Sequence, residues 1–137
     1  MKQIAVAYLT TFVAFVAIDF VWLSFMGERL YRPVLKDLLA PEFRIAPAVV
    51  FYLAYAAGLV WFVVLPALGS DGWRPALVNG ALLGLFAYAT YDLTNQATLN
   101  VWSVKLTLID LCWGTVLTTT SALGGYFAAR WSEGKFG

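Results

Sequence analysis

Residues 4–26 read IAVAYLTTFVAFVAIDFVWLSFM, an apolar run in which Asp19 is the only charged side chain. A helix needs roughly 20 mostly apolar residues to cross a bilayer, so this stretch is long enough to span one. Three further stretches of the chain have the same character, at about residues 47–68, 76–99 and 102–129. The sequence therefore predicts four transmembrane helices.

The composition requires an apolar solvent. The 137 residues are 61% hydrophobic and only 12% charged, and the mean hydropathy is +0.76. Soluble domains are about 45–50% apolar and about 25% charged, which excludes a soluble domain of this size. The net charge of +1 provides no electrostatic footprint for nucleic acid and no polybasic patch for anionic lipid.

Short polar connections separate the second, third and fourth stretches, and such links join antiparallel neighbours. We therefore predict an all-α, up-down-up-down four-helix bundle that forms one membrane domain over residues 1–137. Basic residues are nearly balanced between its two ends, so the orientation in the membrane stays open.

The long connection, residues 27–46, mixes basic and apolar side chains with helical spacing. Pro33 is placed to start a short helix and Pro41 to stop one. We expect an amphipathic helix in the membrane interface. Two roles remain open: a connector against the lipid headgroups, or a lid over a site on that face.

Three carboxylates, Asp19, Asp92 and Asp110, lie inside or at the edge of the predicted spans. An ionised carboxylate costs several kcal/mol to bury in hydrocarbon, so such residues usually face the bundle interior and mark a site. Because successive spans alternate in direction, all three fall in the same half of the membrane, roughly 8 to 14 Å from the face that carries residues 27–46. We expect one polar cluster.

Neighbouring side chains on the same helix faces extend this cluster. The predicted ligand-binding residues are Asp19, Trp22, Tyr88, Asp92, Asn95, Gln96, Asp110 and Trp113. The pattern Ile-Asp-x-x-Trp occurs twice, at residues 18–22 and 109–113, and places an indole one turn from each acid. It indicates either remnant internal symmetry or two walls of one pocket. The alternative is that the acids only hold helices together by accepting hydrogen bonds.

Small residues four positions apart predict close helix contacts. The pairs are Ala54 and Gly58, Gly80 and Gly84, and Ser121 and Gly125. We expect these contacts inside the bundle rather than at a homodimer interface.

Three segments together resemble a known family: Ile18-Asp19-x-x-Trp22, Tyr91-Asp92-Leu93-Thr94-Asn95 and Ile109-Asp110-x-x-Trp113-Gly114. They are similar to small bacterial inner-membrane proteins catalogued as a domain of unknown function. The likeness covers nearly the whole chain. It implies a multi-pass protein of the bacterial cytoplasmic membrane and implies no activity.

Three functions fit these observations. The leading hypothesis is a carboxylate pocket in the membrane that binds or transports a cationic or amphipathic small molecule, with proton exchange, since crowded acids in a low dielectric repel one another. The second is an acid-base enzyme acting on a lipid or isoprenoid, with Asp19 and Asp110 as catalytic residues. The third is an accessory subunit of a larger membrane complex. A homodimer is the other assembly that stays open.

No cofactor and no metal site are expected. The chain has no histidine and a single cysteine, Cys112, so the commonest metal ligand is missing and no internal disulfide can form. The expected partners are the lipid bilayer and the small ligand.

Overall fold

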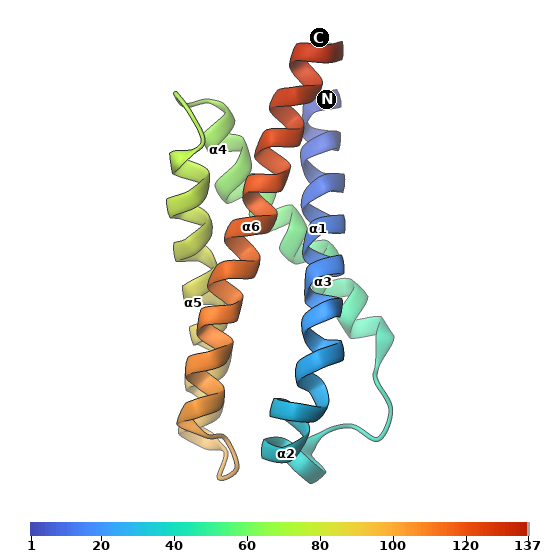
Figure 1. Cartoon of the computed structure of the whole chain (residues 1–137), viewed down its shortest axis with the longest axis vertical. Helices are drawn as coiled ribbons and strands as arrows, with labels where there is room; N and C mark the ends of the chain where they lie inside the picture. Colours follow the sequence, from blue (N-terminus) through green and yellow to red (C-terminus); the bar gives the residue numbers. More distant parts are fainter. Residues whose placement is uncertain (137) are drawn as a thin grey trace.

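Four long helices form the molecule in the computed structural model, which describes residues 1–136 and the side chains up to residue 134 (Figure 1). They are α1 (Lys2–Met26), α3 with α4 (Ile45–Leu59 and Leu65–Leu68), α5 (Arg74–Thr98) and α6 (Val104–Phe136). All four are long and apolar enough to cross a membrane. The predicted all-α, four-span bundle is confirmed, and the described residues contain no strand.

The helices alternate in direction, so the start of α1 and the end of α6 lie at one end of the bundle (Figure 1). The connection between α5 and α6 lies at the other end, together with α2 (Arg32–Leu35). All but one of the helix ends lie within two residues of the predicted span bounds. The exception is α6, which continues beyond residue 129 because polar residues can prolong a helix into water after its apolar part has ended.

The segment after α1 stays helical instead of breaking at Gly27. A π-helical turn, Gly27–Tyr31, leads into α2, and a 3-10 turn, Lys36–Leu38, ends before Pro41. The expected short helix between the first two spans is therefore present. Leu30 and Leu35 are buried against Trp102 and Leu106 at the start of α6. This packing holds the segment across the end of the bundle.

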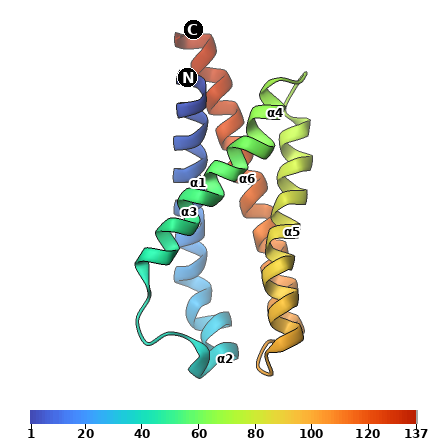
Figure 2. The same ribbon diagram turned by 180° about the vertical axis from the view of Figure 1, so that it is seen from behind.

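The second span crosses the bundle obliquely (Figure 2). Its first part, α3, lies beside α1, and α4 reaches α5 after a second π-helical turn, Val60–Val64. The apolar core of the bundle forms around that turn. Its buried members are Ala7, Leu59, Val60, Val63, Val64, Ala67, Ala76, Ala122, Tyr126 and Ala129.

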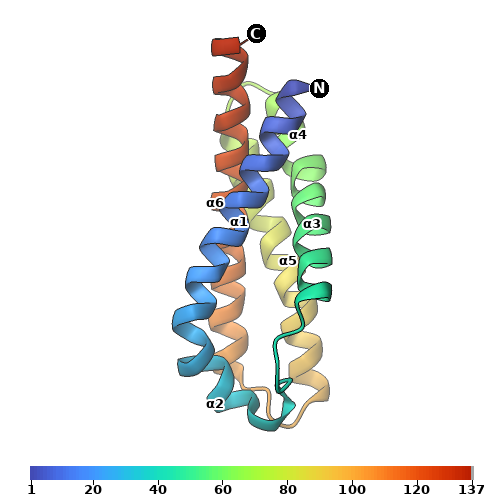
Figure 3. The same ribbon diagram turned by 90° about the vertical axis from the view of Figure 1, so that its right-hand side faces the viewer.

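Helix α6 is central and packs against both α5 and α1, which lies across it (Figure 3). A Cβ atom added at Gly80 would lie 3.3 Å from the Cα of Thr119 on α6. One added at Gly125 would collide with the hydroxyl of Thr11 on α1. Two of the three predicted small-residue contacts are therefore confirmed.

The prediction for Ala54 and Gly58 is wrong. Ala54 is exposed, and no atom of another element lies within 4 Å of a Cβ added at Gly58. The oblique course of this span turns the face with Ala56 and Leu59 toward the core instead, and both of those side chains are buried. Spacing permits a close approach, but the crossing angle decides which face is used.

Candidate functional site

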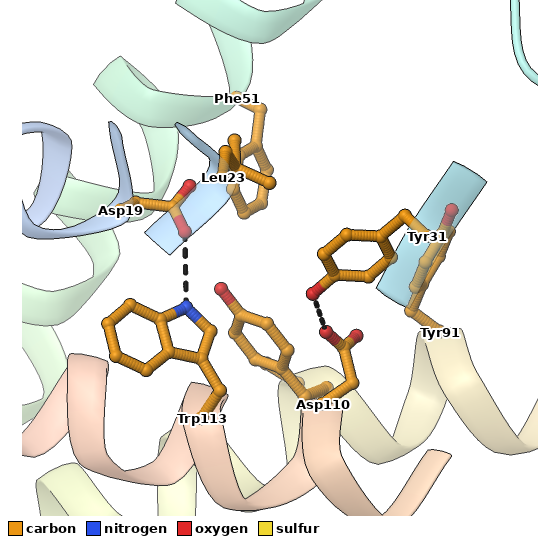
Figure 4. A pocket seen from close by; sticks show the side chains of 9 residues that line it. Asp19, Leu23, Tyr31, Phe51, Tyr91, Asp110 and Trp113 are labelled. Carbon is orange, nitrogen blue, oxygen red and sulfur yellow. Dashed lines mark hydrogen bonds between the residues drawn. The ribbon is translucent and has the colours of Figure 1, made fainter. Parts of the chain in front are cut away.

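A cavity of about 390 Å³ opens in the half of the bundle that carries α2 (Figure 4). Residues from every span contribute to it, and Tyr31 is supplied by the π-helical turn after α1. The lining residues are Asp19, Leu23, Tyr31, Phe51, Ala87, Tyr88, Tyr91, Asp110 and Trp113.

Asp19 is held by two donors from other helices. The hydroxyl of Tyr52 donates to Asp19 Oδ2 at 2.6 Å, and the indole N–H of Trp113 donates to Oδ1 at 3.2 Å. The residue is only 8% exposed. It follows Ala7, Thr11 and Phe15 at intervals of four along the buried face of α1, so helical periodicity directs it inward.

Asp110 is the second carboxylate of the cavity and is 5% exposed. It accepts a hydrogen bond from the hydroxyl of Tyr31. That hydroxyl in turn accepts one from the indole N–H of Trp22 at 2.9 Å. Two aromatic residues outside α6 therefore connect Asp110 to α1 and to the turn that follows it.

The two Ile-Asp-x-x-Trp segments meet face to face. The rings of Trp22 and Trp113 are stacked with centroids 4.3 Å apart and planes 8° apart. Because α1 and α6 are antiparallel, each indole lies level with the acid of the other helix. Trp113 reaches Asp19 directly, whereas Trp22 reaches Asp110 through Tyr31. The repeated motif thus builds two walls of the same cavity.

Asp92 lies beside the cavity and does not line it. Its exposure is 0%, and no donor among the described groups reaches either of its carboxylate oxygens. The carboxyl of Asp110 on α6 is close enough to interact with Asp92 electrostatically.

Tyr88 lies one helical turn before Asp92 and lines the cavity. Its ring rests on the backbone of α6 at Gly114, where an added Cβ would overlap the ring. A glycine is required there because any larger residue would push the phenol away. Gly114, at the end of the second Asp-x-x-Trp segment, thus sets the position of a cavity wall.

The structure brings together four of the eight predicted site residues as cavity lining: Asp19, Tyr88, Asp110 and Trp113. Trp22 stacks on Trp113, and Asp92 interacts electrostatically with Asp110, but neither residue lines the cavity. Asn95 and Gln96 are half-buried further along α5 and do not line the cavity. The ligand-binding role of all eight residues stays a prediction.

Sequence reasoning missed several residues of the cavity and its surroundings. The predicted site residues do not include Leu23, Tyr31, Phe51 and Ala87, which line the cavity, or Tyr52, which donates to Asp19. The two tyrosines lie in the same half of the membrane as the acids, so their depth was an available signal. Their rotation toward the acids could not be read from spacing.

The electrostatics of the cavity are one-sided. Of the side chains that the structure describes, no lysine or arginine lines it. Lys105 is exposed near the start of α6. Among residues 1–134, moreover, no three acidic or cysteine side chains come close enough to hold a metal ion. The cavity therefore offers carboxylates and aromatic rings to whatever enters it.

The model of the family described as "Predicted membrane protein (DUF2177)" matches residues 4–127. The chain belongs to this family. The match includes every residue of the cavity and confirms the expected membership of a multi-pass membrane family of unknown function. No curated protein and no solved structure matches the chain.

Proposed function

We propose that this protein binds an organic cation in the cavity between Asp19 and Asp110 and transports it across the bacterial cytoplasmic membrane in exchange for protons. The observation that supports binding most directly is the composition of the cavity wall. It combines two buried carboxylates with five aromatic rings and no basic side chain among the described residues.

Each component of this wall favours a positive charge. The carboxylates supply the counter-charge that a desolvated cation requires. Rings of tyrosine, tryptophan and phenylalanine attract a cation over their faces, by about 2 kcal/mol when the contact is desolvated. An ammonium group with apolar substituents can use both components, because its substituents contact the rings while its charge faces the acids.

The pair formed by Asp92 and Asp110 supports the coupling to protons. Two buried carboxyls that interact electrostatically repel each other when both are ionised, and no described donor reaches Asp92 to compensate its charge. A proton on either carboxyl removes one of the two charges. A cation that enters the cavity beside Asp110 supplies a positive charge in its place, so its binding favours release of the proton.

Binding is tested with octyltrimethylammonium, using octyl sulfate and octanol as probes with the same chain. The purified protein in lipid nanodiscs should bind the ammonium ion at least tenfold more tightly than either control probe. Asp19→Asn and Asp110→Asn should each weaken binding at least tenfold while the protein stays folded, because the amide keeps the shape and removes the charge. Asp71→Asn, in the exposed turn before α5, is the matched control.

Equal binding of the three probes would refute the proposal. So would a loss of folding in both variants with binding retained, since the acids would then only hold the helices together. Turnover of a lipid without a gradient would favour the enzyme hypothesis instead.

Coupling is measured in proteoliposomes that enclose a fluorescent pH indicator. Addition of octyltrimethylammonium outside should move protons in the opposite direction, and Asp92→Asn should abolish this signal. Cation uptake without proton movement would refute the exchange.

A further inference from the structure

We infer that the cavity takes a single-chain ammonium amphiphile laterally from the bilayer, with the headgroup between the carboxylates and the hydrocarbon chain left in lipid between α3 and α5. This inference rests on the proposed cation site and adds its ligand class and its route of entry.

The first observation is the separation of α3 from α5. The second span packs on α5 mainly through its later part, the π-helical turn Val60–Val64 and α4, and α3 itself makes at most marginal contact with α5. Figure 2 shows α3 diverging from α5 toward the end that carries α2. Helix-to-helix packing therefore does not close the side of the bundle between α3 and α5 at the depth of the acids.

The second observation is the set of residues at this side. Phe51 on α3 and Tyr91 on α5 both line the cavity and are nevertheless 47% and 59% exposed. Ala87, one turn before Tyr91 on the same helix, lines the cavity with a small side chain. Residues that are shared between a cavity and the outer surface of a membrane helix border a mouth that faces lipid.

Leu23 on α1 also lines the cavity and is 37% exposed, so the mouth extends to α1. The sides toward α6 and toward the end of the bundle are covered. Tyr31 and the turn that carries it lie across the end of the bundle, where Leu30 and Leu35 are buried against α6. Trp22 and Trp113 are stacked on the side of α1 and α6. A ligand that enters from water at that end would have to displace the hydrogen-bonded Tyr31, whereas the mouth between α3 and α5 requires no displaced contact.

The chemistry of mouth and cavity together defines the ligand. The carboxylates lie inside the cavity, whereas the mouth is bordered by aromatic side chains and a small apolar one. A cation with one apolar chain matches both parts, because the chain passes the mouth and remains in the hydrocarbon of the membrane. A compact cation without a chain would use the cavity alone.

The experiment measures affinities for tetramethylammonium, butyl-, octyl- and dodecyltrimethylammonium in nanodiscs. Affinity for free probe in water should rise about fourfold per added methylene, through partition into lipid. When the affinity is calculated instead from the concentration of probe dissolved in the lipid, it should stay constant from octyl to dodecyl. A mouth closed to lipid would exclude the long chains, so a collapse of the dodecyl affinity on this lipid scale would overturn the inference.

A blocking variant provides the second measurement. Ala87→Phe places a ring in the mouth and should lower the dodecyl affinity at least tenfold more than the tetramethylammonium affinity. Leu93→Phe adds a ring on the exposed face of the same helix and is the matched control. An equal loss for both probes, or an equal effect of both variants, would overturn lateral entry while leaving the cation site standing. If no ammonium probe binds at all, the proposed function itself fails.

Discussion

Gly84 lies where α5 packs tightly on α6, and its replacement tests the packing that supports the cavity. A Cβ added there would lie 2.6 Å from the carbonyl oxygen of Gly114 and 2.7 Å from the Cβ of Thr118. Favourable contacts between carbon atoms lie at about 3.5 to 4.0 Å, so the helices would have to separate by about 1 Å. Overpacking of this kind costs about 1–3 kcal/mol.

Gly58 provides a matched control, because it also lies within a membrane helix and an added Cβ would meet nothing within 4 Å. Gly58→Ala should be neutral or stabilise the protein by up to about 1 kcal/mol, since alanine is the better helix former. The free energies of unfolding of the two variants should therefore differ by about 1–4 kcal/mol.

The assay is unfolding in mixed micelles by titration with a denaturing detergent, followed by helical circular dichroism. Gly84→Ala should unfold at a lower denaturant fraction than the wild type, and Gly58→Ala at the same fraction or a higher one. If both variants unfold together with the wild type, α5 and α6 do not pack as the structure describes. The positions of Tyr88 and Asp92 would then lose their support.

Two further predictions concern the cavity wall. Tyr52→Phe removes one of the two donors to Asp19. It should lower the free energy of unfolding by about 1 kcal/mol, which is the contribution typical of an interhelical hydrogen bond in a membrane. The same detergent titration measures this change, and an unchanged free energy would mean that the bond contributes nothing. Gly114→Ala should displace the ring of Tyr88 and weaken octyltrimethylammonium binding in nanodiscs at least tenfold. Gly134→Ala is the control and should bind the probe normally, because an added Cβ meets nothing there.

The sequence alone determines where the four spans lie and at what depth in the membrane the acids sit. An apolar run of given length marks a membrane helix, and alternating direction places residues of different spans at the same depth. Asp19 and Asp110 could therefore be assigned to one half of the membrane before any packing was known. The repeated Ile-Asp-x-x-Trp pattern also pointed to residues that come together.

Only the tertiary structure decided which side chains face each other at that depth. Tyr88 and Asp92 lie one turn apart on one helix, yet the first lines the cavity and the second is enclosed between helices. Tyr31 reaches Asp110 because a π-helical turn directs the chain across the end of the bundle, and Tyr52 reaches Asp19 because the second span crosses obliquely. Helix rotation and crossing angle depend on how all the side-chain surfaces fit together, a property of the packed bundle that the spacing along one chain does not contain.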